Sequence, residues 1–363
     1  MSQRFLVLDS FRGIAAIIVM LYHIRILDSV TTINFFQEGG LFVEFFFVLS
    51  GFVLTHTYGY KEVSFKKFII SRTFRLYPLH LFMFLMFFLL QIIQLICVKY
   101  GINFNKEPFS GTTAFSEIIP NLLFLQSWLP FSSPISWNQP SWSLSVEYYM
   151  YIIFFFTLFI KSNFKYFVWL LISFTSFYII LNNFQIMNEV VRGLSCFFAG
   201  ALIYLFYNNY RENFEKINSN IFTSIELFLL ILIIYVISNT QEYKSLFVSF
   251  IFLLIVFLFA FEKGFFSKIL KMRIFQLFGK LSYSIYMTHV LIIFCIKALV
   301  TIIDKIFNKN YILIVNNSIE MDFGNIFINN LVVLLIVFIV IIISIFTYKF
   351  IEIKGQEFGK KFI

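Results

Sequence analysis

The sequence contains little charge. Only 13% of its 363 residues are Asp, Glu, Lys or Arg, about half the share of an ordinary soluble domain, whereas 60% are hydrophobic. So few charged side chains cannot cover a water-facing surface, which excludes a soluble globular protein. The net charge of +9 is not gathered into a separate basic domain, so we expect no nucleic-acid partner.

Cysteine is scarce as well. The three cysteines, Cys97, Cys196 and Cys295, show no CxxC or paired spacing, and each lies at or within an apolar stretch. This pattern predicts neither a disulfide framework nor a metal site. The N-terminus lacks the small-residue cleavage pattern of a signal peptide, so we expect the first apolar segment to remain in the protein.

The sequence is instead rich in long apolar runs. A helix needs roughly 20 residues to cross the bilayer, and ten stretches are long enough: 6–27, 40–58, 76–98, 141–160, 165–182, 190–207, 220–238, 244–261, 281–303 and 326–350. An eleventh, 113–128, is interrupted by Pro120 and predicts a short re-entrant or interfacial segment. We expect an all-α polytopic membrane helix bundle forming one domain over residues 1–363, with no appended soluble domain.

The distribution of Lys and Arg predicts the orientation. Cytoplasmic loops retain positive charge, and with the N-terminus inside, 19 of the 28 basic residues fall in inner segments and 6 in outer loops. This split predicts that both termini are cytoplasmic. The membrane itself is expected to be the cytoplasmic, or inner, membrane.

Ionisable residues interrupt the first span, "LDSFRGIAAIIVMLYH". Such groups are costly in a membrane and by default indicate a functional cavity, the alternative being an interfacial side chain that reaches water. Arg12 and His23 are eleven residues apart, which places them on one face of a helix, about 16 Å apart along its axis. This stripe could bind an anion near Arg12 and move protons at His23. Asp9 is spaced to orient Arg12.

The second span carries a carboxylate in "LFVEFFFVLSGFVL". Glu44 is predicted at a depth similar to His23, and a carboxylate commonly orients the imidazole of a catalytic base. Ser50 interrupts the run of Phe, as small residues do where helices approach closely or a ligand needs room. Packing explains this stretch equally well.

Two arginines precede the third span, in "FIISRTFRLYPLH". Arg72 and Arg75 would share one helix face immediately before Tyr77 and Pro78 begin the span. Two guanidinium groups at a cytoplasmic surface suit a multiply charged phosphate ligand. A cluster that only fixes membrane topology is an equal alternative.

Two further stretches are polar for membrane spans. "SWNQPSWSLSVEYYMYIIF" places Trp142, Ser143 and Glu147 around the start of the fourth span, where aromatic faces beside polar groups could bind a sugar. "GKLSYSIYMTH" puts six hydrogen-bonding residues, Tyr283 and His289 among them, into the ninth span. These side chains need partners or a wet cavity.

Together these motifs resemble the membrane-bound acyltransferase-3 family. The resemblance includes "LDSFRG" with its Arg12 to His23 spacing, "FFFVLSGFVL", Arg-x-x-Arg followed by Tyr-Pro, "PSWSLSVEYYMYIIF", "GKLSYSIYMTH" and a closing "YKFIEIKGQ", and it covers almost the entire chain. Tyr148 stands where the family often has a second acidic residue. Members of the family move an acyl group, usually acetyl, from cytoplasmic acyl-coenzyme A (acyl-CoA) to a hydroxyl of a carbohydrate.

The resemblance implies an O-acyltransferase that uses acetyl-CoA as a donor and binds no cofactor tightly. The hypothesis assigns catalysis to His23, Glu44 and Glu147, and donor binding to Arg12, Arg72 and Arg75. Trp142 and Ser143 are expected to bind a surface or lipid-linked glycan; Asp9, Ser50, Tyr283 and His289 are expected to support the site. A proton-coupled transporter or exporter would also need intramembrane Arg, His and Glu, and a structural component of a polysaccharide export machine is a third interpretation.

Overall fold

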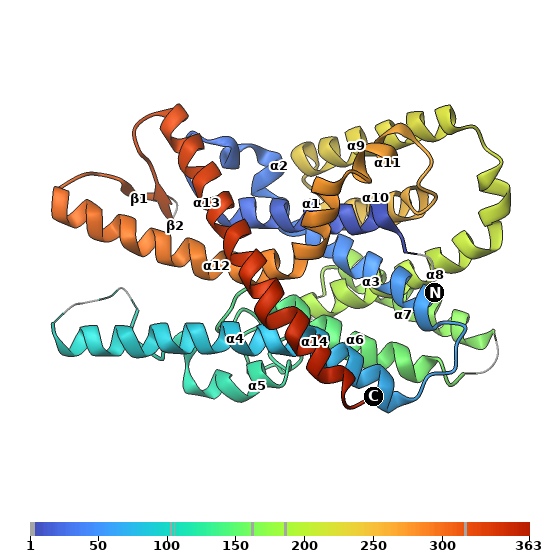
Figure 1. Ribbon diagram of the computed structural model, residues 1–363, viewed down its shortest axis with the longest axis horizontal. Coiled ribbons are helices and arrows are strands. Elements are labelled where there is room, and N and C mark those ends of the chain that lie inside the picture. Colours follow the sequence, from blue (N-terminus) through green and yellow to red (C-terminus); the bar gives the residue numbers. More distant parts are fainter. Residues whose placement is uncertain (1–3, 102–103, 105, 161–162, 185–186, 316–317) are drawn as a thin grey trace.

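The protein is described by a computed structural model over residues 4–101, 104, 106–160, 163–184, 187–315 and 318–363 (Figure 1). Its longer helices are α1 (Leu6–His23), α3 (Phe42–Tyr58), α4 (Phe65–Lys99), α6 (Ser141–Thr157), α7 (Phe164–Leu181), α8 (Asn188–Glu215), α9 (Ser219–Asn239), α10 (Lys244–Phe259), α12 (Arg273–Phe307) and α13 (Ile326–Thr347). Each of the ten expected spans falls on one of these helices. The bundle is therefore that of a polytopic helical membrane protein.

Shorter elements connect these helices. They are η1 (Val30–Thr32), α2 (Asn34–Gln37), η2 (Gly39–Leu41), η3 (Gly111–Thr113), η4 (Phe115–Glu117), α5 (Ile118–Leu122), α11 (Phe265–Leu270), the π-helical turn η5 (Tyr348–Glu352) and α14 (Ile353–Lys360). The segment 113–128, expected not to span, forms the short helices η4 and α5 and a series of turns. One antiparallel hairpin, β1 (Ile312–Val315) with β2 (Ser318–Met321), departs from the all-α expectation.

Fewer helices meet the length and composition of a membrane span than the sequence suggested. Within the described residues, seven are long and apolar enough: Leu6–His23, Gly39–Tyr58, Phe65–Lys99, Phe164–Leu181, Asn188–Glu215, Ser219–Asn239 and Ile326–Lys360. Of the other three expected spans, α6 has 17 residues and α10 has 16, both short of the roughly 20 that a perpendicular crossing needs. The third, α12, is 35 residues long but carries the polar cluster at 282–289.

The start of α4 differs from expectation. The helix begins at Phe65, where the Ser64 hydroxyl accepts a hydrogen bond from the Lys67 backbone N–H, and Pro78 lies inside it. Arg72 and Arg75 therefore belong to the helix itself. The Ser64 cap therefore begins a helix that carries both arginines ahead of the expected span at 76–98.

Helix α1 packs directly on α12 in the middle of the molecule (Figure 1). A Cβ atom at Gly13 would lie 2.5 Å from the backbone of Phe278, and one at Gly279 would lie 2.4 Å from the carbonyl oxygen of Asp9. Only glycine allows this approach, since real side chains would clash. The helices run in the same direction, because Asp9 lies against Gly279 at one end and His23 lies against His289 at the other.

Candidate active site

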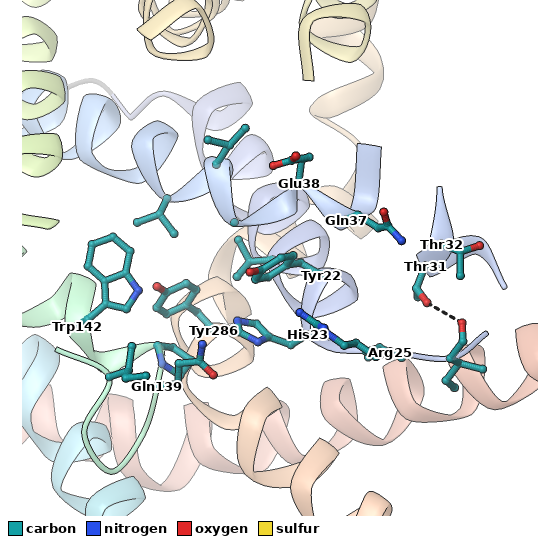
Figure 2. Close-up of a pocket in the computed structure, with 18 of the residues that line it drawn as sticks. Tyr22, His23, Arg25, Thr31, Thr32, Gln37, Glu38, Gln139, Trp142 and Tyr286 are labelled. Carbon is teal, nitrogen blue, oxygen red and sulfur yellow. Dashed lines mark hydrogen bonds between the residues drawn. The ribbon is translucent and has the colours of Figure 1, made fainter. Parts of the chain in front are cut away.

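The first cavity lies at the C-terminal end of α1 and has a volume of 670 Å³; we call it the His23 cavity. Its lining includes His23, Arg25, Trp142, Arg192 and Tyr286 (Figure 2). His23 is the last residue of α1, and the chain turns to extended backbone at Ile24, which ends the helix. The imidazole therefore lies at the C-terminal end of the helix and lines the cavity, where a polar ligand can reach it.

The second cavity, of 460 Å³, lies nearer the start of α1, and we call it the Arg12 cavity. Arg12 lines it together with Arg75 from α4 and Glu147 from α6. Asp9 lies beside Arg12, with its Oδ1 atom 3.5 Å from Nη1 of Arg12, and its Oδ2 atom is 2.6 Å from Nε of Arg4. This position is compatible with the expected role of Asp9 in orienting Arg12, which stays a prediction.

Helix α1 contributes to both cavities. Arg12 lines one and His23 lines the other, so the residues predicted to share one face do not open into one pocket. Tyr286 on α12 lines both cavities.

His23 is flanked by aromatic rings. Its ring centroid lies 4.8 Å from that of Tyr22 and 5.0 Å from that of His289, which is fully buried on α12. The His289 Nδ1 atom is 3.1 Å from the Ile285 carbonyl oxygen, so Nδ1 donates and carries the proton of the neutral ring. Its Nε2 atom is buried without a hydrogen-bond partner in the described part of the chain. The structure thus brings the predicted supporting residue His289 next to the predicted base.

Glu44 does not orient His23. Its Oε1 atom accepts hydrogen bonds from Arg192, at 3.1 Å from Nε and 2.8 Å from Nη2, and from the Ser245 hydroxyl at 2.8 Å. The Arg192 guanidinium in turn lies 5.6 Å from the centre of the Trp142 ring. A buried carboxylate needs a cation, and the nearest one comes from α8. Glu44 therefore fixes Arg192 against Trp142, and the predicted pairing with His23 is wrong.

Glu147 lies in the Arg12 cavity instead of beside Trp142. It accepts a hydrogen bond of 2.6 Å from Ser50 and another from the Tyr151 hydroxyl. Five residues along a helix correspond to a turn of about 140° beyond a full rotation, so Trp142 and Glu147 face different cavities. The structure therefore places Glu147 apart from Trp142, and Ser50 lines the Arg12 cavity with Glu147.

The two arginines of α4 have different surroundings. Arg75 lines the Arg12 cavity. The Arg72 Nη2 atom donates a 3.0 Å hydrogen bond to the Tyr58 hydroxyl, and its guanidinium lies over the rings of Tyr58 and Tyr151 at 5.4 and 5.8 Å. Arg72 is not among the residues that line either cavity, so its expected direct contact with the same ligand as Arg75 is not reproduced.

The remaining predicted residues also line the Arg12 cavity. The Tyr283 hydroxyl donates a 2.6 Å hydrogen bond to the carbonyl of Leu76, and Ser143 pairs with the Tyr286 hydroxyl at 2.8 Å. Ser143 and Trp142 are adjacent in the sequence but line different cavities, since Trp142 lines the His23 cavity. No three His, Cys, Asp or Glu side chains of the described residues gather where they could hold a metal ion.

The sequence interpretation missed Arg192 and the position of Tyr286. In the distribution of basic residues, Arg192 is one of the six in outer loops, and no motif distinguishes it. The available signal was the buried Glu44 at a matching depth, because an intramembrane carboxylate calls for a cationic partner. Tyr286 was one of six polar residues on α12, and nothing in the spacing distinguished it from the others.

Comparison with known proteins identifies the family. The profile described as an acyltransferase domain matches residues 5–349, nearly the whole chain. The chain belongs to the acyltransferase-3 family. Acyltransferase MdmB of Streptomyces mycarofaciens is 36% identical over 117 residues, which cover 32% of this chain and 27% of that protein. Protein 2 in the picA locus of Rhizobium radiobacter is 32% identical over 161 residues, covering 40% of this chain and 78% of that protein.

No solved structure matches this acyltransferase-3 chain. The alignment spans only about a quarter of MdmB, so the relative shows the kind of protein and not the substrates of this one. The family match supports the acyltransferase interpretation of the sequence over the transporter interpretation.

Proposed function

We propose that this acyltransferase moves an acetyl group from cytoplasmic acetyl-CoA to a hydroxyl of a surface or lipid-linked carbohydrate. One observation carries the proposal: two cavities of different chemistry share Tyr286 in their lining, one lined also by Arg12 and Arg75 and the other by His23 and Trp142. A transfer between two dissimilar substrates needs such an arrangement, since each must reach the reacting atoms from its own side.

The Arg12 cavity suits the donor. Coenzyme A is a polyanion, and guanidinium groups bind phosphate through paired charge-assisted hydrogen bonds. In this proposal Arg12 and Arg75 hold phosphate groups, while the thin pantetheine arm extends towards Tyr286. Arg72 acts less directly, through Tyr58 and Tyr151, which it contacts. The donor is a co-substrate, and no tightly bound cofactor is needed.

The His23 cavity suits the acceptor and the chemistry. An alcohol is a poor nucleophile, and a positioned imidazole that removes its proton typically contributes about 10²–10⁴-fold to the rate. His23 would take the hydroxyl proton while the oxygen attacks the thioester carbonyl. The carbon–sulfur bond then breaks, and the coenzyme A thiolate leaves and is protonated. Transfer through a transient acyl-His23 would use the same residue.

A polyhydroxylated acceptor fits the lining of this cavity. Trp142 offers an aromatic face of the kind on which sugar rings stack, and Gln139, Thr31 and Thr32 offer hydrogen bonds. The carboxylate of Glu44, through Arg192, holds the Trp142 face in place. The acceptor in this proposal is an O-antigen, capsule or other surface glycan.

The proposal also sets the orientation. The 19 to 6 distribution of basic residues supports ten spans with both termini in the cytoplasm of a cell with this protein in its inner membrane. One of the nineteen, Lys161, lies outside the described residues. In this orientation the Arg12 cavity opens to the cytoplasm, where the donor is made, and the His23 cavity opens to the opposite side.

The test uses purified protein in lipid nanodiscs with radiolabelled acetyl-CoA and candidate glycans. The expected result is label on the glycan together with release of coenzyme A. Solute flux without labelling would support a transporter, and two negative assays would support a structural component; either result would overturn the proposal. Mass spectrometry of surface glycans from cells with and without the gene then identifies the acceptor by an acetyl mass difference.

A further inference from the structure

Tyr286 occupies a unique place between the two cavities. Among the described residues that line them, it is the only one shared by both. Figure 2 shows its ring between the side chains of Trp142 and His23 in the view of the His23 cavity. A chain that extended from the Arg12 cavity to the His23 cavity along their shared lining would lie against this ring.

The ring is held on several sides. Its hydroxyl lies 2.8 Å from the Ser143 hydroxyl, which itself donates to the carbonyl of Pro140 at 3.1 Å. Because the Ser143 proton is used in that bond, Tyr286 donates to Ser143. Phe46 packs edge-on against the ring at 5.7 Å between centroids, and the His289 ring lies 6.0 Å away. Only 6% of Tyr286 is exposed.

For a donor whose arm runs from the Arg12 cavity to the His23 cavity, a ring fixed in this way sets the width of the passage. Protein interiors are densely packed, so a side chain held by a hydrogen bond and two aromatic neighbours cannot move aside without losing those contacts. A thioester whose acyl group lies beyond the ring has room set by Tyr286 on one side and His23 on the other. Each added methylene then has to displace either the ring or the acceptor.

We propose that Tyr286, anchored by Ser143, is the residue that limits the length of the transferred acyl group. The inference deepens the function proposed above and rests on it, because it assigns the donor's acyl group to this passage. Tyr286 acts as a specificity-determining residue through the position of its ring. The hydroxyl serves to hold the ring and has no separate chemical task.

The experiment compares acetyl-, butyryl- and hexanoyl-CoA as donors for the wild type, Tyr286→Leu and Tyr286→Phe. One methylene in an apolar pocket changes kcat/KM by about 10–200-fold, so Tyr286→Leu should raise the butyryl-to-acetyl ratio of kcat/KM at least about tenfold. Tyr286→Phe keeps the ring but frees it from Ser143, so its ratio should rise by a smaller factor. Ser143→Ala should match Tyr286→Phe.

Tyr283→Leu is the matched control. Tyr283 lies three residues earlier on α12 and lines the Arg12 cavity alone. Its replacement should change the donor KM without changing the chain-length ratio. Acetyl transfer by the Tyr286 variants shows that they are folded, and thermal unfolding in detergent checks any variant that lacks it.

Three outcomes would overturn the inference. The first is an unchanged butyryl-to-acetyl ratio of kcat/KM in a folded Tyr286→Leu variant; the second is an equal change of this ratio in Tyr283→Leu. Loss of all transfer in Tyr286→Phe, with folding intact, would also overturn it, because it would assign the hydroxyl a chemical role. Failure of the function proposed above is distinguishable: the wild type itself would then transfer no acyl group from any of the three donors.

Discussion

The imidazole rings of His23 and His289 lie 5.0 Å apart, although the residues belong to the first helix and to one near the end of the chain. The glycine contact between α1 and α12 makes this possible, because it brings the two backbones together. His23 faces a cavity, whereas His289 is enclosed. We therefore expect the two histidines to act as a unit in which only His23 reaches the substrate.

Replacing His23 tests the base. His23→Ala should lower acceptor-dependent release of coenzyme A by about 100-fold or more, the usual contribution of a general base. The release is followed with a thiol reagent, and size-exclusion chromatography in detergent checks folding. Wild-type turnover in a folded His23→Ala protein would remove the assignment.

A double-mutant cycle tests the coupling of the histidines. His289→Ala should lower the rate less than His23→Ala, since His289 supports the ring that performs the proton transfer. Residues in contact are not additive, so the combined variant should lose no more than His23→Ala alone. A loss equal to the product of the two single losses would show that they act independently.

Replacing arginines of α4 tests the donor site. Arg75→Ala should weaken acetyl-CoA binding by about tenfold or more, because hydrogen bonds to charged groups contribute about 1.5–3 kcal/mol. Arg72→Ala is the control three residues away, and its effect should be smaller because its guanidinium contacts Tyr58. Binding is measured by isothermal titration. An equal loss of acetyl-CoA affinity in both variants would contradict the structure, in which Arg75 lines the Arg12 cavity and Arg72 does not.

Replacing Glu44 tests the ion pair with Arg192. Glu44→Gln should lower the free energy of unfolding by about 2 kcal/mol; the loss stays below the roughly 3–5 kcal/mol typical of fully buried pairs, because the Arg192 side chain is 29% exposed. Glu38→Gln is the control, since its bond to Lys244 involves a side chain that is 44% exposed and should contribute less than about 1 kcal/mol. Thermal unfolding in detergent measures both. A similar loss of unfolding free energy in Glu44→Gln and Glu38→Gln would contradict the structural role of Glu44.

The loop after β2 contains a carboxylate, Asp322, whose contribution to stability depends on pH. Hydrogen bonds from the Asn329 amide and the Gly324 backbone N–H lower the pKa of Asp322. A carboxyl whose pKa is lowered on folding stabilises the fold above its usual pKa of about 3.9, and this contribution disappears as the pH falls through the lowered value. Asn329 also donates to the carbonyl of Leu27, four residues after His23.

The loop prediction is measured by hydrogen exchange. Asn329→Ala should speed amide exchange around Leu27 at neutral pH, because it frees this carbonyl and the Asp322 side chain together. Asn330, whose side chain accepts from the Val30 N–H, is the neighbouring control position. In Asn330→Ala the change should centre on Val30. Unchanged exchange at Leu27 in Asn329→Ala would contradict the role of this loop.

The sequence predicted the helices better than the partners of their polar residues. Apolar length and periodicity are local properties, so all ten helical segments were located, as were Arg12 and His23 on α1. Partners depend on which helices pack together, which has no local signal. Glu44 could not be assigned to Arg192, nor His23 to His289, without the packing of α3 on α8 and of α1 on α12.

Glu226 illustrates the same limit. This buried carboxylate on α9 was not singled out from the sequence, although it carries the cost of an ionisable group in a span. In the structure it accepts hydrogen bonds from the backbone N–H groups of Gly264, Phe266 and Ser267, which begin α11. The carboxylate caps the N-terminal end of α11. The residues that it caps lie about forty positions later in the sequence, so nothing near Glu226 indicates this role.

The parallel contact of α1 with α12 has a consequence for how the enzyme is made. The first helix leaves the ribosome with Arg12 and His23 already present, but its packing partner follows some 266 residues later. At about 5–20 residues per second, roughly 15–50 s of synthesis separate the two. During that interval α1 lacks the helix against which it packs, so the contact between His23 and His289 can form only after α12 has been inserted.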